Sequence, residues 1–363
     1  MDMKVALIGV GQAGGKIAQR IAEFDHRMDF GAVQGGLAIN TAKPDLQSLD
    51  LDTVLIGQDR VKGHGVGGDN ELGAEIMEED AEQVMDALDD RITAKAEAIL
   101  VVAGLGGGTG SGGAPVLARE LRRIYDVPVY VLGILPGRNE GSLYQVNAGR
   151  SLKTLTKVSD SLLLIDNDAW HESGESVSGA FEAINDAIAR RLGLLLAAGE
   201  VDAGADVAES VVDSSEIINT LRKGGIAALG YGTAEAGEDG AENVNAVTSV
   251  VRRALLTNTS LPNATTADAA LVVVAGRPDA IPRKGVERAR KWVEDETGSL
   301  EVRGGDYPVD SDQLAAIVLL GGVERSQRVQ DFLERASEAQ EELPARDPDP
   351  TETFQNEELE DLF

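Results

Sequence analysis

The sequence of 363 residues holds 62 acidic and 33 basic residues, and its formal net charge of -29 argues against general binding to nucleic acid or to anionic membranes. It contains no cysteine and three histidines, which excludes disulfides and thiolate chemistry and leaves little material for a zinc site. Its length and its 42% of hydrophobic residues are typical of a globular protein with two packed domains.

Apolar and amphipathic segments alternate along the first half of the chain. Short apolar runs predict strands at residues 4–9, 36–41, 53–57, 98–103, 127–135 and 161–166. Helical spacing of apolar residues predicts helices at residues 14–24, 71–88, 114–124 and 139–157. This alternation indicates a parallel sheet covered on both faces, on which ligands bind beyond the carboxyl ends of the strands.

The second half begins with a long helix, predicted from residue 178 to about residue 198, that has no strand beside it in the sequence and would connect two domains. A second set of elements follows, with strands at residues 225–232, 270–276 and 315–322 and helices at residues 244–256 and 283–296. From residue 336 the composition becomes acidic and poor in apolar residues, which predicts disorder.

We therefore predict an α/β protein in four parts. These are an N-terminal parallel-sheet domain over residues 1–177, a central helix over residues 178–200, a smaller C-terminal α/β domain over residues 201–335 and an acidic disordered tail over residues 336–363. No apolar window reaches the length of a membrane span, and the N-terminus has no signal-peptide pattern, so we expect a cytoplasmic protein without membrane insertion.

Three glycine-rich loops, at residues 9–14, 63–70 and 104–113, each stand between a predicted strand and a predicted helix. A flexible linker is the alternative interpretation of the third loop, and a turn in which Asp69 or Asn70 caps the next helix is that of the second. Helix starts present free backbone N–H groups that bind anions. Three such loops in one sheet favour a polyphosphate site made of backbone donors.

The first loop also matches the G-x-G-x-x-G pattern of dinucleotide-binding folds. Asn40 and Thr41, however, stand where such a site needs an acidic ribose ligand, which counts against an NAD-dependent oxidoreductase. A Walker A loop is excluded as well, because Lys16 is followed by Ile17 instead of serine or threonine.

The run GGGTGSG at residues 106–112 is the signature loop of the tubulin and FtsZ superfamily, and the chain resembles that superfamily in the order of its loops from about residue 3 to residue 330. Residues 11–15 (GQAGG), residues 40–43 (NTAK) and the strong acidity look most like the CetZ group, the tubulin-like proteins of salt-loving archaea. The resemblance implies that the glycines cradle GTP or GDP, with Mg²⁺ as helper and no metal site built from side chains alone.

The resemblance assigns nucleotide contacts by position to Gly11, Gln12, Ala13, Gly14, Asn40, Thr41, Gly67, Gly68, Asp69, Asn70, Gly106, Gly107, Gly108, Thr109, Gly110, Ser111, Gly112, Glu140 and Asn167. It implies that Gln12 reaches phosphate or its metal ion and that Glu140 holds the ribose, although the loop around Glu140 lacks the arginine pair common in FtsZ.

Phe181 and Asn185 lie four residues apart, on one face of the long helix. The resemblance implies that Phe181 covers the guanine, that Asn185 reads its edge, and that Asp186 corresponds to a base contact of FtsZ. Burial in the core is the alternative for Phe181, because amphipathic helices carry such residues routinely.

Asp213 and Glu216, in the run VVDSSEIIN at residues 211–219, are spaced to share a helix face. A helix cap with an acid in the first turn is the alternative interpretation. The resemblance implies that Glu216 is the catalytic acid and Asp213 its companion, acting on the γ-phosphate in the next subunit, with Val211 in place of the asparagine common in FtsZ. It thus implies a slow, assembly-dependent GTPase that forms head-to-tail filaments.

The cellular role implied by the resemblance is control of cell shape or motility. An FtsZ-like division protein and a non-hydrolysing GTP-binding scaffold are the alternatives. The partner expected is a second copy of the chain, and a short motif at residues 358–363 (ELEDLF) offers a site for a protein partner as the minority interpretation of the tail.

Overall fold

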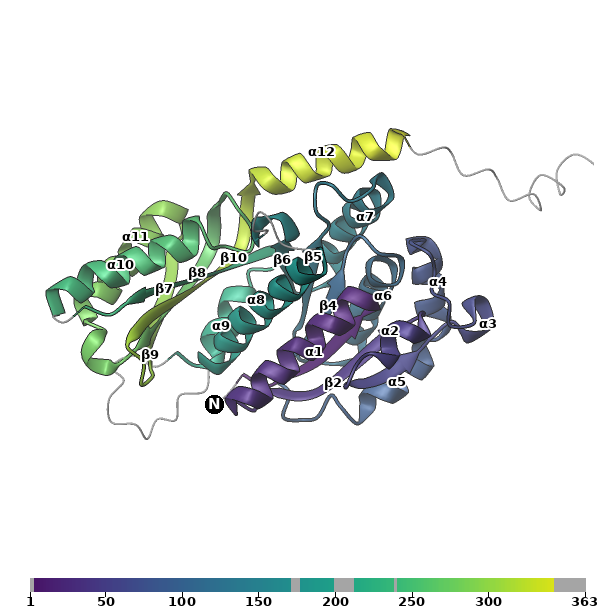
Figure 1. The fold of residues 1–363 in the computed structure, drawn as a ribbon, viewed down its shortest axis with the longest axis horizontal. Helices are drawn as coiled ribbons and strands as arrows, with labels where there is room; N and C mark the ends of the chain where they lie inside the picture. The colour runs from purple at the N-terminus through teal and green to yellow at the C-terminus, as the bar shows by residue number, and fades with distance from the viewer. Residues whose placement is uncertain (1–2, 171–176, 199–211, 238–239, 343–363) are drawn as a thin grey trace, which may run out of the picture.

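The computed structural model describes residues 3–170, 177–198, 212–237 and 240–342 (Figure 1). One ten-stranded sheet runs through the molecule in the order β3-β2-β1-β4-β5-β6-β7-β10-β8-β9. In sequence, its strands are β1 (Val5–Val10), β2 (Val33–Asn40), β3 (Asp52–Leu55), β4 (Ala98–Gly104), β5 (Val129–Leu135), β6 (Ser161–Asp166), β7 (Ile226–Glu235), β8 (Ala264–Gly276), β9 (Glu301–Pro308) and β10 (Gln313–Ser326).

Helices cover the sheet and connect its strands. The α-helices are α1 (Gly11–Met28), α2 (Lys43–Gln47), α3 (Gln58–Val61), α4 (Asn70–Glu79), α5 (Ala81–Asp89), α6 (Gly108–Ile124), α7 (Ser142–Val158), α8 (Val177–Ala198), α9 (Ser214–Leu221), α10 (Gly240–Leu256), α11 (Arg283–Thr297) and α12 (Gln327–Glu342). Two short 3₁₀ helices are η1 (Asn167–Trp170) and η2 (Pro278–Ala280).

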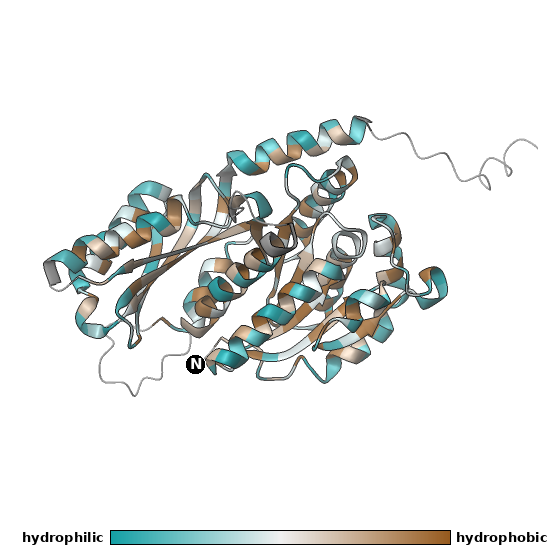
Figure 2. Ribbon diagram, viewed as in Figure 1, coloured by the Kyte–Doolittle hydropathy of each residue, from teal (hydrophilic) through white to brown (hydrophobic). Residues whose placement is uncertain are grey.

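Alternate residues of the buried strands supply two cores, one on each face of the sheet. Ile8 of β1 lies in the core that also contains Leu117 of α6, whereas Leu7 lies in the core that contains Ile17 of α1 and Ile188 of α8. Figure 2 shows the strands as the apolar layer and the helices with polar outer faces. The prediction of a parallel sheet covered on both faces is confirmed for β1 to β6, which pair in parallel.

The C-terminal elements extend the same sheet and make it mixed. β7 joins β6 in parallel through Leu162↔Ile226, while β10 lies antiparallel between β7 and β8. β9, which the sequence pattern did not predict, pairs in parallel with β8 at the edge. The predicted fold class, with an α/β N-terminal half and a further α/β part, is confirmed.

Two predicted boundaries differ from the structure. The single helix predicted over residues 71–88 is divided into α4 and α5 at Asp80, whose Oδ2 accepts a 2.6 Å hydrogen bond from the distant Gly57 N–H. Helix α12 continues through residues 336–342, which the composition assigned to the tail, because Ala336 and Ala339 are buried. Residues 343–363 of the predicted tail lie outside the described residues.

The long helix predicted from residue 178 is present as α8, which has 22 residues and is therefore about 33 Å long. It packs beside α1 in the centre of the molecule (Figure 1). Its first turns lie at the carboxyl ends of the parallel strands, where Phe181 and Asn185 face a pocket, and its far end lies against the sheet, where Leu195 and Leu196 are buried.

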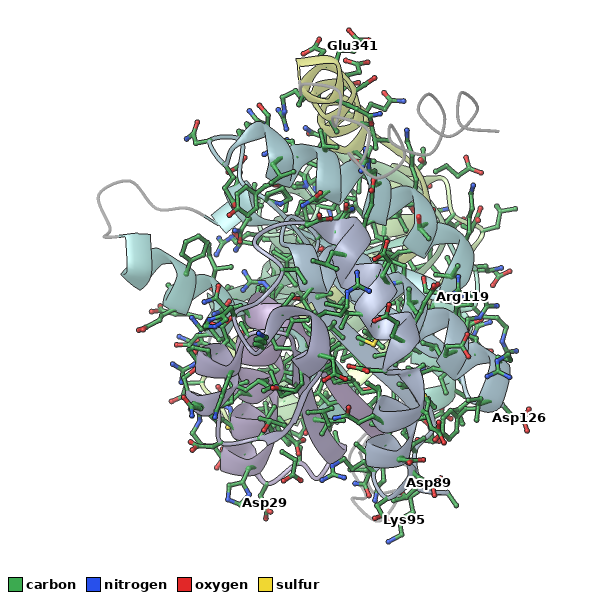
Figure 3. All side chains as sticks on the ribbon, turned by 90° about the vertical axis from the view of Figure 1, so that its right-hand side faces the viewer. Asp29, Asp89, Lys95, Arg119, Asp126 and Glu341 are labelled. Carbon is green, nitrogen blue, oxygen red and sulfur yellow. The ribbon has the colours of Figure 1, made fainter. Side chains whose placement is uncertain are left out.

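Charged side chains project outward all around the molecule, for example Asp29, Asp89, Lys95, Arg119, Asp126 and Glu341 (Figure 3). The negative charge is thus spread over the described surface and is not confined to one element. None of the helices that the structure describes is both long enough and apolar enough to cross a membrane.

Candidate nucleotide site

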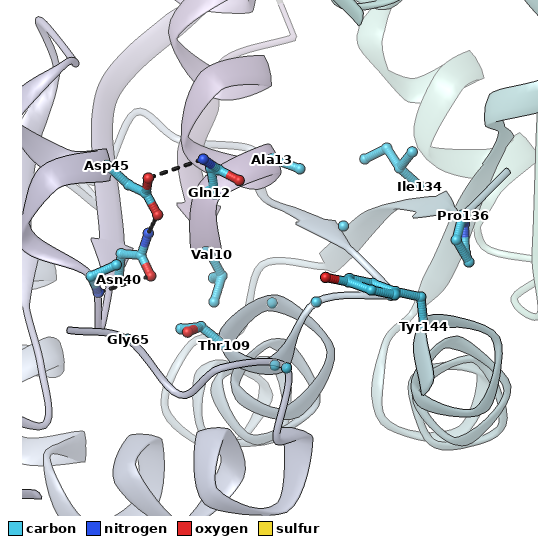
Figure 4. Close-up of a pocket in the computed structure, with 18 of the residues that line it drawn as sticks. Val10, Gln12, Ala13, Asn40, Asp45, Gly65, Thr109, Ile134, Pro136 and Tyr144 are labelled. Atoms are coloured by element: carbon cyan, nitrogen blue, oxygen red, sulfur yellow. Dashed lines mark hydrogen bonds between the residues drawn. The ribbon is translucent and has the colours of Figure 1, made fainter. Parts of the chain in front are cut away.

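A pocket of about 470 Å³ opens at the carboxyl ends of the parallel strands (Figure 4). Its wall consists of the loops that follow β1, β2, β4, β5 and β6, together with residues 64–68 of the second glycine-rich loop and the start of α8. Pockets for small ligands in proteins have about this volume, usually 300–1,000 Å³. The position is the one at which open parallel sheets bind ligands.

Backbone N–H groups dominate one side of the pocket. Helix α1 begins at Gly11 and helix α6 at Gly108, and neither has a side-chain cap at its N-terminus. The first N–H groups of such helices have no partner within the helix and are available to an anion. A Cβ atom added to Gly67 or Gly107 would meet nothing within 4 Å, which shows that the backbone there borders open space.

Other glycines let the loops touch one another. Gly11 adopts a φ of +74°, and a Cβ atom on it would lie 2.9 Å from the nitrogen of Gly110. A Cβ atom on Gly110 would lie 2.6 Å from the oxygen of Gly104, and one on Gly108 would lie 2.9 Å from the oxygen of Asp69. Side chains at these positions would push the three loops apart, which explains the glycine content of the signature loop.

Polar side chains connect the loops that follow β1, β2 and β4. Gln12 Nε2 donates to Asp45 Oδ1 at 3.0 Å, and Asn40 Nδ2 donates to Asp45 Oδ2 at 3.1 Å (Figure 4). The hydroxyls of Thr41 and Thr109 lie 2.7 Å apart and share a hydrogen bond. Gln12 and Asn40 are thereby held on the pocket wall by one carboxylate.

The second glycine-rich loop, at residues 63–70, is held in place by two sets of hydrogen bonds. Asp69 caps α4, since its side chain accepts hydrogen bonds from the N–H groups of Glu71 and Leu72, as the capping interpretation predicts. The buried amide of Asn147, on α7, donates to the carbonyls of Gly68 at 2.7 Å and Gly106 at 3.0 Å. Asn147 therefore sets the spacing between the second and third glycine-rich loops, a role that no sequence motif indicated.

The opposite wall offers side chains to a second part of a ligand. Glu140 lies at the rim, where its Oε1 accepts a 2.8 Å hydrogen bond from the Gly137 N–H. Asn167 is buried to 6% exposure and lines the pocket at the end of β6. Phe181 and Asn185 reach it from α8, and the Phe181 side chain is 40% exposed, so the alternative of a core residue is wrong.

Most of the predicted contact residues line this pocket, namely Gly11, Gln12, Ala13, Asn40, Gly67, Gly68, Gly106, Gly107, Gly108, Thr109, Gly110, Glu140, Asn167, Phe181 and Asn185. The predicted residues Gly14, Thr41, Asp69, Asn70, Ser111 and Gly112 belong to the same loops and helix starts but do not line the pocket. Gly14 and Gly112 serve packing, because Cβ atoms there would lie 2.2 Å from the Val102 oxygen and 2.0 Å from the Asn70 oxygen.

Asp186 also lies off the wall. Its Oδ1 lies 3.5 Å from Arg20 Nε on the neighbouring α1, and 60% of the aspartate side chain is exposed. The structure therefore gives Asp186 a partner on α1 instead of a place in the pocket.

Val10, His64, Gly65, Val66 and Gly104 also line the pocket and lie within the three predicted glycine-rich loops, although they were not assigned as contacts one by one. The lining residues that the sequence interpretation did not find are Lys16, Ala42, Asp45, Ile134, Leu135, Pro136 and Tyr144. Asp45 sits in the first turn of α2 after a proline, and an acid so close to Asn40 was the available signal. Tyr144 leans over the pocket from α7 and is 43% exposed, which is unusual for a large aromatic side chain (Figure 4).

Asp213 and Glu216 lie together at the start of α9. Asp213 caps the helix by accepting hydrogen bonds from the N–H groups of Ser215 at 2.8 Å and Glu216 at 3.2 Å, so the capping interpretation is confirmed. The hydrogen bond from the Ser215 hydroxyl, followed by these backbone bonds, lowers the pKa of Asp213 below its ordinary value. The Glu216 carboxylate is half-exposed, with Oε2 3.4 Å from Arg303 Nη1 on β9.

The two acids lie at the opposite end of the sheet from the pocket. The Ser214 hydroxyl donates to Glu97 Oε1 at 3.0 Å, and Glu97 immediately precedes β4. The pocket begins where β4 ends, at Gly104. Within one subunit the acids and the pocket are therefore separated by the length of a strand, and the acids face outward beside Leu300, which is 92% exposed.

Comparison with known proteins agrees with this geometry. Residues 4–175 match the model of the tubulin/FtsZ family GTPase domain, and residues 174–338 match that of the tubulin-like CetZ C-terminal domain. The chain is 66% identical to the tubulin-like protein CetZ2 of Haloferax volcanii over 363 residues, which cover 99% of this chain and 100% of that one. It is 49% identical to CetZ1 of the same organism, over 94% of this chain and 93% of the other.

Solved structures show the same relationship. The structure of CetZ2 from Haloferax volcanii, described as a GTPγS-bound protofilament, has a TM-score of 0.90 at 67% identity, covering 94% of this chain and 99% of that one. That of CetZ1, described as a GDP-bound monomer, has a TM-score of 0.85 at 50% identity, covering 93% of this chain and 100% of the other. The chain belongs to the tubulin/FtsZ superfamily, as a tubulin-like protein of the CetZ group with a GTPase domain followed by that group's C-terminal domain.

Proposed function

We propose that this tubulin-like protein binds GTP in the pocket, assembles head to tail into filaments and hydrolyses GTP where two subunits meet. The observation that carries the proposal is the placement of the glycine-lined pocket and of Glu216 at opposite ends of one sheet. When subunits stack along the direction of the strands, the acid end of one subunit covers the pocket of the next. Contacts of this kind do not close on themselves and give filaments.

The pocket suits each part of a guanine nucleotide. The N-termini of α1 and α6 and the open backbone at Gly67 and Gly107 suit the phosphates. Glu140 suits a ribose hydroxyl, and the exposed ring of Phe181 with the nearby Asn185 suits stacking and hydrogen bonding to the base. The structures of two relatives, CetZ2 bound to GTPγS and CetZ1 bound to GDP, support this assignment.

The acids supply the chemistry that the pocket lacks. Hydrolysis of a phosphoanhydride depends on positioning a water molecule and on stabilising charge at the γ-phosphate. We assign Glu216 to orienting that water in the neighbouring pocket and Asp213 to holding Glu216 at the start of α9, through the hydrogen bond that its Oδ1 accepts from the Glu216 N–H. The lowered pKa of Asp213 keeps it ionised at neutral pH.

Oxygen ligands on the pocket wall also suit a divalent cation. Asp45 offers a carboxylate and Gln12 an amide oxygen, and Mg²⁺ prefers such ligands together with phosphate oxygens and water. When bound, Mg²⁺ would neutralise charge on the phosphates. Gln12 and Asp45 would hold the cation through their side-chain oxygens, and Asn40 fixes the Asp45 carboxylate by its hydrogen bond to Oδ2.

The proposal has consequences for turnover and for the cell. GTP hydrolysis should be slow in dilute protein and rise with assembly, because neither subunit alone holds a complete site. We propose a cytoplasmic location, a role in cell shape or motility, and a protein partner for residues 358–363, which lie outside the described residues.

The experiment that tests the proposal measures phosphate release from GTP against protein concentration, in concentrated KCl with Mg²⁺, with light scattering recorded in parallel. We expect the rate per molecule to rise steeply at the concentration where scattering begins. A rate per molecule that stays constant across that concentration would show that each subunit carries a complete site, and it would overturn the shared-site assignment.

A further inference from the structure

A buried ion pair fastens the last helix, α12, to the end of β6. Arg328, in the first turn of α12, places its Nε 2.5 Å from Asp166 Oδ2 and its Nη2 2.7 Å from Asp166 Oδ1. Both side chains are 2% exposed. Nη2 also lies 3.1 Å from Asp168 Oδ2, so one guanidinium group holds two carboxylates.

These two aspartates flank a residue of the nucleotide site. Asn167, which lines the pocket, stands between Asp166 and Asp168 in the chain. Asp168 in turn reaches the loop after β5, because its Oδ2 accepts a 2.9 Å hydrogen bond from the Arg138 N–H. The same loop carries Glu140 to the rim of the pocket.

We propose that Arg328 is a positioning residue for the nucleotide pocket and that the seating of α12 is coupled to nucleotide affinity through Asp166 and Asp168. The inference rests on the proposed function, because it takes Asn167 and Glu140 as nucleotide contacts. Arg328 itself does not line the pocket. It acts through the backbone that carries these two residues.

The physical basis is the charge that Arg328 neutralises. Its hydrogen bonds with Asp166 raise the pKa of the guanidinium above its ordinary value, so the arginine stays charged. Without it, the buried Asp166 carboxylate would lose the positive partner that it has among the described residues, an arrangement that strongly favours rearrangement of the surrounding chain. A cavity of about 400 Å³, lined by Asp166, Asp168, Arg328 and residues 138–139, adjoins the cluster and gives the loop after β5 room to shift.

The coupling must act in both directions. If the seated α12 strengthens nucleotide binding, bound nucleotide stabilises the seated α12 by the same factor. Helix α12 otherwise packs on α7 and the core through buried apolar residues, among them Val329, Phe332 and Ala336, and a Cβ atom on Gly149 of α7 would lie 2.8 Å from the Cβ atom of Ala336. The ion pairs of Arg328 are the contacts that link the helix to Asp166 and Asp168, and through them to the wall of the pocket.

The test compares Arg328→Gln with Phe332→Leu, because Phe332 lies on the same helix, is fully buried and makes none of these ion pairs. Binding of a fluorescent GDP analogue and the thermal midpoint are measured for both. We expect Arg328→Gln to weaken GDP binding roughly ten-fold, a usual size for coupling between sites. Phe332→Leu leaves the helix seated and these ion pairs in place, so it should lower the midpoint and leave affinity unchanged. Arg328→Lys should recover part of the affinity, since lysine restores the charge without the two parallel hydrogen bonds of the guanidinium.

Hydrogen exchange of residues 327–342 supplies a second readout. GDP should slow exchange in this helix in the wild type and have no such effect in Arg328→Gln. If Arg328→Gln does not fold, Asp168→Asn removes the charge of the more exposed aspartate of the pair, which is 25% exposed, and a smaller loss of affinity is expected there.

Equal loss of affinity in Arg328→Gln and Phe332→Leu, unchanged affinity in Asp168→Asn, or exchange of α12 that ignores GDP in the wild type would each overturn the coupling. Failure of the wild type to bind GDP at all would instead refute the proposed function, so the two failures are distinguishable.

Discussion

The two ends of the sheet present different kinds of chemical group. At the pocket end, helix N-termini and glycine backbone form much of the wall, and the lining includes few charged side chains, Lys16 against Asp45 and Glu140. At the opposite end, charged side chains predominate: Glu216 pairs with Arg303, and Glu301 pairs with Lys223 at 2.6 Å.

The difference predicts how each end responds to mutation. A cradle of backbone donors tolerates little added volume and offers few side chains to remove. A face of charged side chains tolerates changes in volume but depends on the chemical identity of each group. Substitutions can therefore abolish the function of one end while leaving the other intact, which would not be possible if one subunit held the whole site.

The largest effect is expected from Glu216→Gln. The substitution keeps the size of the side chain and removes its charge, so we expect GTP turnover to fall at least about 100-fold, the range of a lost general base. GDP affinity should not change, because Glu216 lies at the end of the sheet away from the pocket. Phosphate release and GDP titration measure the two quantities.

The matched control is Glu301→Gln, which removes a carboxylate from the same face and breaks its pairing with Lys223. A comparable loss of turnover in this control would mean that the charge of the face matters and not Glu216 itself. Loss of GDP binding in Glu216→Gln would show that the two ends are not independent.

Complementation between inactive subunits sharpens the comparison. Gly107→Val should block the pocket, since the backbone there borders open space, and should leave the acid end intact. A mixture of Gly107→Val and Glu216→Gln subunits would contain interfaces with a sound pocket and a sound acid. We expect turnover to reappear in mixtures that sediment as filaments, and an inactive mixed filament would contradict the shared site.

Two glycines of the signature loop should respond in opposite ways. A Cβ atom on Gly112 would lie 2.0 Å from the Asn70 oxygen, so Gly112→Ala must separate α4 from α6 and should lower the free energy of unfolding by about 1–3 kcal/mol. Gly107→Ala meets nothing within 4 Å and should keep the stability but weaken GDP binding. Thermal unfolding and GDP titration of both variants distinguish packing from binding; equal stability of the two variants would contradict the packing role of Gly112.

Leu300 offers a smaller effect on assembly alone. It is 92% exposed at the acid end, directly before β9. If the next subunit covers it, Leu300→Ser should raise the critical concentration for assembly roughly ten-fold, equivalent to about 1.4 kcal/mol per contact. Sedimentation against concentration measures this, with Leu256→Ser, 51% exposed on α10, as the control that should change nothing.

The sequence predicted the features that local pattern determines. Buried strands such as β5, with every residue buried, follow from unbroken apolar runs, and the glycine loops follow from their flanks. β9 was missed because its sequence EVRGGDYP has no apolar run, and as an edge strand it buries little. The break at Asp80 was missed because it depends on a hydrogen bond to Gly57, distant in sequence.

The same distinction holds in the site. Gly106 to Gly110 could be predicted to line the pocket, because a wall made of backbone donors needs glycine in the sequence. Asn147 and Arg328 could not, because each is a single polar residue in an ordinary helix whose role appears only when distant segments meet. The contact of Asp186 with Arg20 could not be predicted for the same reason, since Arg20 is on another helix.

The smallest effect expected separates the two roles of Asp213. Asp213→Ala removes the acceptor for the N–H groups of Ser215 and Glu216 and should lower the free energy of unfolding by about 1 kcal/mol. Asp213→Asn keeps a good capping residue, so its stability at neutral pH should stay near that of the wild type while GTP turnover falls. Denaturant unfolding and phosphate release measure both.

The pH dependence of the free energy of unfolding also distinguishes wild type from Asp213→Asn. The pKa of Asp213 lies below its ordinary value of 3.8 in the folded protein, so the ionised group stabilises the fold above that value and its contribution disappears as the pH falls through the folded pKa. Any advantage in stability of the wild type over Asp213→Asn should therefore be constant at neutral pH and vanish in acid. If Asp213→Asn and Asp213→Ala were equally destabilised at pH 7, the carboxylate charge and not the cap would hold α9 in place, and the acid end would depend on charge for its structure as well as for its chemistry.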